Sequence, residues 1–95
     1  MSELRKQLID QPLHVLMCAA SVLALAIAFQ LSGDGIAAST FAGVSLTALW
    51  VGLREWHQWP SSRWWDPPMD WAFEAVGMAL GAWLYVAHVG PALAS

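Results

Sequence analysis

Long apolar runs separated by short polar segments dominate the chain, and this pattern predicts three membrane-spanning helices. No charged residue occurs in the run 13–31 or in the run 36–53. A third span covers about 69–89, where the apolar run from 71 onward is interrupted only by Glu74 and His88. A helix needs about 20 mostly apolar residues to cross roughly 30 Å of hydrocarbon. We therefore expect an all-α membrane protein with a single domain, 1–95.

The first span is expected to stay in the mature protein, because it is longer than the 7–15 apolar residues usual in a signal peptide. The short segment before Pro12 is expected to lie along the membrane surface. Residues 32–35 read Ser-Gly-Asp-Gly, which favours a tight turn. So short a connection predicts that the first two spans form an antiparallel hairpin.

The second and third helices are expected to be joined by a tryptophan-rich loop over 54–68. The second helix is predicted to extend past the membrane surface and to end at Pro60, because proline lacks the N–H that a helix interior needs. Asp66 is expected to cap the third helix. The pair Gly90-Pro91 is expected to stop it.

The basic residues predict how the helices are oriented. Two precede the first span and two lie between the second and third spans: Arg5, Lys6, Arg54 and Arg63. Because basic residues accumulate on the cytoplasmic side, this places the N-terminus and the 54–68 loop in the cytoplasm and the C-terminus on the exported side. Six of the seven tryptophans fall between 50 and 71, which favours a position at the lipid headgroups.

Composition agrees with a membrane location and excludes one class of partner. Charged residues make up 12% of the 95 residues and hydrophobic ones 58%, whereas soluble domains have about 25% charged residues. The net charge is −3 and there is no basic tract, so the sequence predicts no nucleic-acid binding. The expected partner is the lipid bilayer itself.

Glu74 is the most informative polar residue, because a charged carboxylate inside the bilayer costs on the order of 2–3 kcal/mol. Asp70 lies one helical turn earlier on the same face, and Gly77 and Gly81 continue that face with a small-xxx-small spacing. This stripe is expected to face protein, either within the chain or in a second copy. The carboxylates either join a structural network with Arg54, Gln58 or Arg63, or line a water-filled path or bind a lipid headgroup.

The sequence lacks the motifs and spacings that are typical of catalytic sites and of metal sites. His14, His57 and His88 are far apart in sequence, without the i, i+4 spacing of a helical metal site. The sequence has no serine nucleophile elbow, no glycine-rich phosphate loop and only one cysteine, Cys18. We therefore expect no cofactor and no enzymatic activity.

A spaced pattern of polar residues and glycines runs through 54–81: Glu55, Gln58, Arg63, Asp66, Asp70, Gly77 and Gly81. This pattern resembles the VanZ-like family of membrane proteins. That family has an E-x-x-Q pair at a helix end, an Arg–Asp loop, and a helix resembling D-x-x-x-N-x-x-G-x-x-x-G. The chain departs from the pattern at Glu74, where the family usually has Asn, and most members are longer with more spans. The short form is similar to small membrane proteins of phages and prophages.

The resemblance implies a protein of the bacterial inner membrane that binds a lipid headgroup or a membrane partner on its cytoplasmic side. The expected binding site consists of Glu55, Gln58, Arg63, Asp66, Asp70 and Glu74, with Gly77 and Gly81 packing helices. One alternative is a phage holin, an oligomer that permeabilises the membrane. Three-span holins typically have a basic cytoplasmic tail, whereas residues 91–95 are uncharged. A further alternative is an accessory subunit of a larger membrane complex.

Overall fold

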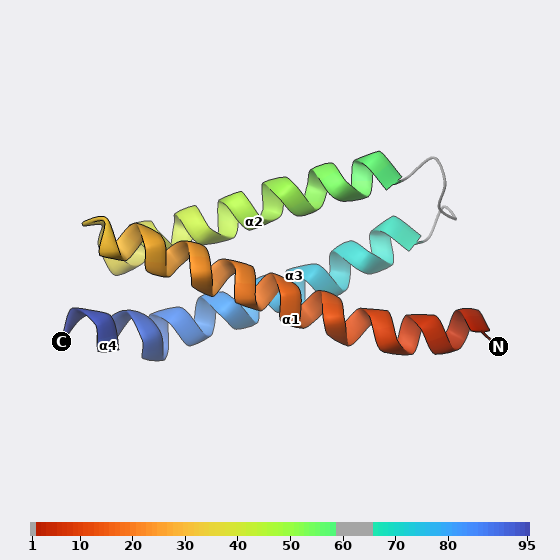
Figure 1. Cartoon of the computed structure of the whole chain (residues 1–95), viewed down its shortest axis with the longest axis horizontal. Helices are drawn as coiled ribbons and strands as arrows, with labels where there is room; N and C mark the ends of the chain where they lie inside the picture. The colour runs from red at the N-terminus through yellow and green to blue at the C-terminus, as the bar shows by residue number, and fades with distance from the viewer. Residues whose placement is uncertain (1, 59–65) are drawn as a thin grey trace.

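The computed structural model describes residues 2–58 and 66–95, with side chains for 9–57 and 70–95. These residues form three long helices, α1 (Ser2–Leu31), α2 (Ile36–Gln58) and α3 (Asp66–Leu84) (Figure 1). The π-helical turn η2 (Tyr85–Val89) and the short helix α4 (Gly90–Ala94) extend α3. Three segments are long and apolar enough to cross a membrane: Ile9–Leu31, Ile36–His57 and Asp70–Ala94. The prediction of an all-α protein with three membrane-spanning helices is confirmed at this level. Residues 59–65, which make up most of the predicted loop, lie outside the described residues.

The segment before Pro12 is the first part of α1 rather than a separate helix. The 30 residues of α1 extend about 45 Å at 1.5 Å per residue, well beyond the roughly 30 Å of hydrocarbon. Pro12 lies inside this helix, where it removes one backbone hydrogen bond. The carbonyl left without its donor belongs to residue 8, outside the apolar span, where water can hydrate it.

The predicted tight turn between α1 and α2 ends α1 with a Schellman motif. Gly33 has a φ of +113°, a left-handed conformation that glycine adopts without a Cβ clash. Its N–H donates to the Gln30 carbonyl at 3.0 Å, and the Asp34 N–H donates to the Phe29 carbonyl at 3.1 Å. These bonds satisfy carbonyls that a helix end would leave free. As predicted, α1 and α2 form an antiparallel hairpin (Figure 1).

The expected stop at Gly90-Pro91 is wrong, because the helix continues to Ala94. The chain first widens into the π-helical turn η2, where the Gly90 N–H donates to the Tyr85 carbonyl. Proline in an α-helix clashes with the carbonyl four residues earlier and lacks its own donor. The wider turn before Pro91 relieves both problems, so α4 extends the third span to its end.

α1 packs against both other helices and more extensively against α3, which it crosses in Figure 1. The packing is close because the facing residues are small. A Cβ at Gly81 would lie 2.8 Å from the Ala19 carbonyl oxygen, and one at Gly43 would lie 2.8 Å from the Val22 carbonyl oxygen. Such backbone contacts are typical of membrane helices, in which small residues allow close approach.

The bundle is apolar outside and partly polar inside, as expected in a bilayer. Phe41 is 75% exposed and Trp56 72% exposed, whereas Thr47 and Ser39 are buried. The Thr47 hydroxyl lies 2.8 Å from that of Ser21, which also accepts a 3.1 Å hydrogen bond from the Trp50 indole. A water-soluble bundle would reverse this pattern. Three of the clustered tryptophans, Trp59, Trp64 and Trp65, lie outside the described residues.

Candidate functional site

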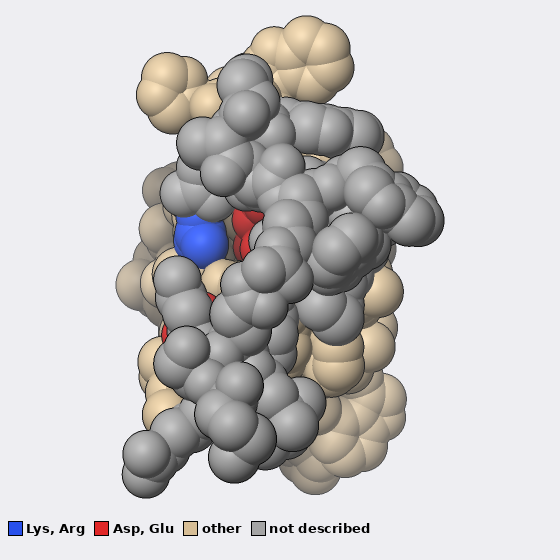
Figure 2. Space-filling view, turned by 90° about the vertical axis from the view of Figure 1, so that its right-hand side faces the viewer, with Lys and Arg blue, Asp and Glu red and all other residues tan. Residues whose placement is uncertain are grey.

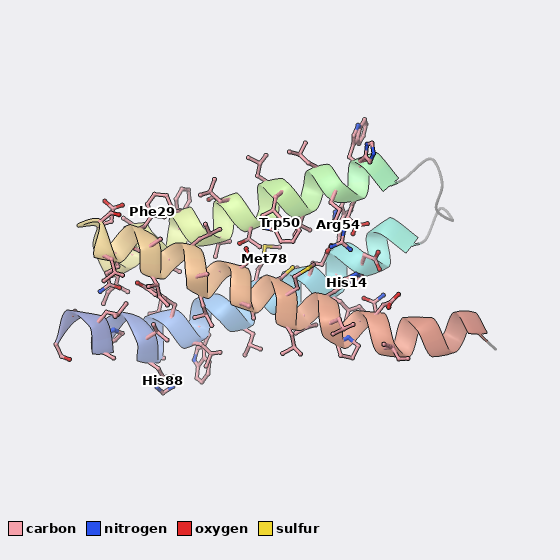
Figure 3. All side chains as sticks on the ribbon, viewed as in Figure 1. His14, Phe29, Trp50, Arg54, Met78 and His88 are labelled. Atoms are coloured by element: carbon pink, nitrogen blue, oxygen red, sulfur yellow. The ribbon has the colours of Figure 1, made fainter. Side chains whose placement is uncertain are left out.

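Polar side chains from all three spans meet at one end of the bundle, and we call this group the polar cluster. Figure 3 shows His14 and Arg54 at this end, away from the turn at 32–35 and the C-terminus. Each helix contributes two residues: Gln11 and His14 from α1, Arg54 and Glu55 from α2, and Asp70 and Glu74 from α3.

The polar cluster lies at one end of the three candidate membrane spans. The three spans contain 22 to 25 residues, so they measure about 33–38 Å at 1.5 Å per residue. The hydrocarbon core is only roughly 30 Å thick. Every member of the cluster lies within about 8 Å of the end of its span by the same rise per residue. Groups at this depth can contact phosphates and amines of lipids.

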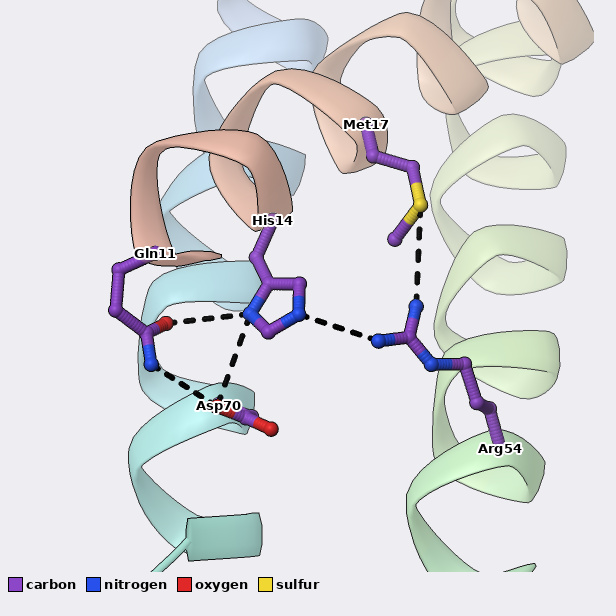
Figure 4. Close-up of polar contacts among 5 residues, drawn as sticks. All are labelled: Gln11, His14, Met17, Arg54 and Asp70. Atoms are coloured by element: carbon purple, nitrogen blue, oxygen red, sulfur yellow. Dashed lines mark hydrogen bonds and ion pairs between the residues drawn. The ribbon is translucent and has the colours of Figure 1, made fainter. Parts of the chain in front are cut away.

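Among the described side chains, Asp70 is held by α1 and not by Arg54. The Gln11 amide donates to Asp70 Oδ1 at 3.0 Å, and His14 Nδ1 lies 3.7 Å from the same oxygen (Figure 4). His14 Nδ1 is also 3.2 Å from Gln11 Oε1. A neutral imidazole with its proton on Nδ1 satisfies these contacts and leaves Nε2 as an acceptor.

Arg54 is held by neutral side chains. Its guanidinium donates to His14 Nε2 at 3.1 Å and to Met17 Sδ at 3.8 Å (Figure 4). Among the described side chains, no carboxylate oxygen lies within ion-pair distance of it. A guanidinium has five N–H donors, and the contacts with His14 and Met17 use two of them. The remaining donors can bind an acceptor that the described part of the chain does not supply.

Glu55 and Glu74 are the buried acidic residues of the cluster, exposed by 1% and 0%. The Glu55 carboxyl lies near those of Glu74 and Asp70. Two carboxylates are both acceptors, so a hydrogen bond between them would require a proton on one of them. In the part of the chain that the structure describes, Glu55 Oε1 and both Glu74 oxygens are buried acceptors that find no donor.

Figure 2 views the bundle along its long axis from the end that carries the polar cluster. Basic and acidic side chains are visible close together on this face. Arg54 is half-buried and the Asp70 side chain is 17% exposed. These two residues are thus partly accessible, whereas Glu55 and Glu74 are buried.

The two ends of the bundle differ in how their buried polar groups are paired. At the far end the Gln30 amide donates to the Gly90 carbonyl at 3.0 Å, and the Tyr85 hydroxyl donates to Gln30 Oε1. Tyr85 is also 3.1 Å from the Ala26 carbonyl. Gln30 and Tyr85 therefore satisfy each other within the chain, whereas Glu55 and Glu74 do not.

The structure brings Glu55, Asp70 and Glu74 together from the predicted site. The side chains of Gln58 and Asp66, and the whole of Arg63, lie outside what is described. Sequence reasoning missed Gln11 and His14, whose i, i+3 spacing near the start of the first span was the available signal. It considered Arg54 only as an ion-pair partner.

Gly77 and Gly81 pack α3 against α1 within the chain. A Cβ at Gly77 would lie 2.9 Å from Val15 Cα and 3.0 Å from Cys18 Cβ. The sequence left open whether this face of α3 packs within the chain or against a second copy. The structure packs it against α1 of the same chain.

Among the described residues, no group of three or more His, Cys, Asp or Glu side chains is arranged to hold a metal ion. No protein-family model, curated protein or solved structure matches the chain. What the arrangement can do is bind a ligand that offers both hydrogen-bond donors and a negative group at the membrane surface.

Proposed function

We propose that this protein binds the headgroup of a phospholipid in its polar cluster. One observation supports this most directly: the cationic group and the buried acidic groups are not paired with one another. Among the described residues, Arg54 is bound to neutral partners, while Glu55 and Glu74 retain acceptors that find no donor. Both signs of charge are therefore available to a ligand, at the depth where lipid headgroups lie.

A purely structural network would pair these charges. Burying an ionised group without a partner costs several kcal/mol, and ionisable residues inside membrane spans usually serve a function. The arrangement with His14 and Met17 keeps the guanidinium available, which favours binding over structural support.

The family resemblance supports the same conclusion from a different direction. The residues that carry the resemblance to VanZ-like proteins include Glu55 and Asp70, both of which belong to the polar cluster. We propose that the protein is a short, phage-type member of that family. We also propose a bacterial inner membrane, with the N-terminus and the polar cluster on the cytoplasmic side because all four basic residues lie there.

Lipid binding is favoured over a holin-like pore. A pore would require an oligomer, and the glycines best suited to a seam between copies are already packed against α1. Liposomes that carry the purified protein should therefore retain a trapped dye at every protein density. Dye release that rises steeply with density would contradict the proposal and favour the pore.

The experiment that tests lipid binding counts the phospholipids that stay bound when the protein is extracted in mild detergent and weighed by native mass spectrometry. The wild type should retain lipid, and Arg54→Gln should lose most of it. His57→Gln is the matched control, because His57 lies on the same end of α2 but is exposed and outside the cluster. Equal retention by Arg54→Gln and the wild type would contradict the proposal. Circular dichroism checks that both variants remain helical.

The orientation is tested with an alkaline phosphatase fused after Ser95. The enzyme is active only outside the cytoplasm, so the fusion should be active in cells. An inactive fusion, together with an active one at the N-terminus, would reverse the proposed topology and place the cluster on the exported side.

A further inference from the structure

The unsatisfied atoms of the cluster indicate which kind of headgroup fits. Glu55 Oε1, Glu74 Oε1 and Glu74 Oε2 are three buried acceptors without a donor among the described residues. A phosphate has only acceptors and cannot satisfy them. A primary ammonium has three N–H donors and no acceptor, so it matches these oxygens in number and in charge.

We infer that the bound headgroup has a primary ammonium beside its phosphate, with the ammonium donating to Glu55 and Glu74 and the phosphate accepting from Arg54. This inference rests on the proposed function, since it specifies the lipid that the same site binds. Phosphoethanolamine is a common headgroup with this chemistry. Phosphoserine also has a primary ammonium, but its carboxylate would add a negative charge beside Glu55 and Glu74. The two charges of phosphoethanolamine are separated by a two-carbon linker, and the guanidinium and carboxylates of the cluster come from α2 (Arg54 and Glu55) and α3 (Glu74).

The arrangement of charges favours a ligand with separate cationic and anionic groups. The described cluster has three carboxyl groups, Glu55, Asp70 and Glu74, and one guanidinium, Arg54. Asp70 is already bound by Gln11 and His14. A phosphoethanolamine group would bring one positive charge to the two remaining acidic residues and one negative charge to Arg54. Hydrogen bonds in which both partners are charged are the strongest of those available here.

Other common headgroups meet only part of this requirement. Phosphocholine offers a phosphate and a positive charge, but its quaternary ammonium has no N–H to donate. Phosphoglycerol offers hydroxyl donors but no cation to balance Glu55 and Glu74. Either would fill the guanidinium side of the site and leave the buried carboxylates without a charged donor.

The test is competition between headgroups with identical acyl chains. The whole protein is exchanged into nanodiscs of equal parts phosphatidylethanolamine, phosphatidylcholine and phosphatidylglycerol, and the lipid that remains bound after extraction is identified by native mass spectrometry. Phosphatidylethanolamine should be enriched about tenfold over phosphatidylcholine, the smallest factor expected for one charge-assisted hydrogen bond. Glu55→Gln and Glu74→Gln together should abolish this preference while total bound lipid is kept. His57→Gln should preserve it.

A chemical series keeps the test valid if the glutamine variants fail to fold. Mono-, di- and trimethylated phosphatidylethanolamine remove the N–H donors one at a time and keep the positive charge. Binding to the unmodified protein should fall with each methyl group.

Two failures can be distinguished. Equal binding across the methylated series would overturn the ammonium assignment while lipid binding stands, and a proton between Glu55 and Glu74 would then satisfy them instead. A preference for phosphatidylethanolamine that survives both glutamine substitutions would overturn the assignment as well. Retention of no lipid of any class would overturn the proposed function as well.

Discussion

Replacing Gly81 with alanine tests the close packing of α1 against α3. The new Cβ would lie 2.8 Å from the Ala19 carbonyl oxygen and 3.0 Å from both Ala19 Cα and Val22 Cβ. Two of these three neighbours are backbone atoms, so no side-chain rotation can relieve the overlap, and the helices must separate. Overpacking of this kind costs about 1–3 kcal/mol. The better helix propensity of alanine returns about 0.5–1 kcal/mol, which leaves a net loss of about 1 kcal/mol at the middle of the two ranges.

Gly52→Ala is the matched control, because a Cβ at Gly52 meets nothing within 4 Å. The free energy of unfolding is measured in mixed micelles by titration with a denaturing detergent, with helix content as the signal. Gly81→Ala should unfold at a lower denaturant fraction than the wild type, and Gly52→Ala should not. A Gly81→Ala variant as stable as Gly52→Ala would refute the close approach of the two helices.

Three further substitutions test other contacts by the same unfolding measurement. Tyr85→Phe removes the donor to Gln30 and should cost about 1 kcal/mol; no loss would mean that the hydroxyl is not bonded there. Thr47→Val keeps the volume but removes the 2.8 Å contact with Ser21, and should cost about 0.6 kcal/mol, the average for hydrogen bonds between membrane helices; a stabilised variant would contradict that contact. Gln11→Leu removes the donor to Asp70 and should lower stability by about 1.5–3 kcal/mol, as for a hydrogen bond to a charged group, whereas Leu13→Ala on the exposed face should change it little.

The spans and the hairpin could be predicted from the sequence because they depend on local properties. A charge-free run of sufficient length indicates a span, and Gly33 supplies the conformation that the turn requires. The continuation past Pro91 could not be predicted in this way. It depends on η2, and no local pattern distinguishes a π-helical turn from an α-helical one.

In the candidate site, too, local features could be predicted from the sequence and contacts between helices could not. Asp70 and Glu74 could be assigned to one face because they are one turn apart on a helix. Their partners could not be assigned, since these come from other helices and depend on how the helices cross. The three-dimensional arrangement joins Asp70 to Gln11 across 59 positions of sequence and turns Arg54 toward His14. Charge alone favoured Arg54 as the partner of the carboxylates, but neutral side chains bind it.

The central claim is that a lipid phosphate binds the guanidinium of Arg54, and solid-state NMR in phospholipid bilayers tests it most directly. With Arg5→Lys and Arg63→Lys, Arg54 is the only arginine, so carbon and nitrogen labels in arginine report on one guanidinium. Hydrogen bonds of about 2.8 Å between nitrogen and phosphate oxygen would bring the lipid phosphorus close enough to dephase the labelled guanidinium signal strongly. We predict this strong dephasing in the Arg5→Lys, Arg63→Lys variant, in which every residue of the polar cluster is unchanged. A guanidinium signal unaffected by phosphorus, in a protein that is otherwise folded and embedded, would contradict it.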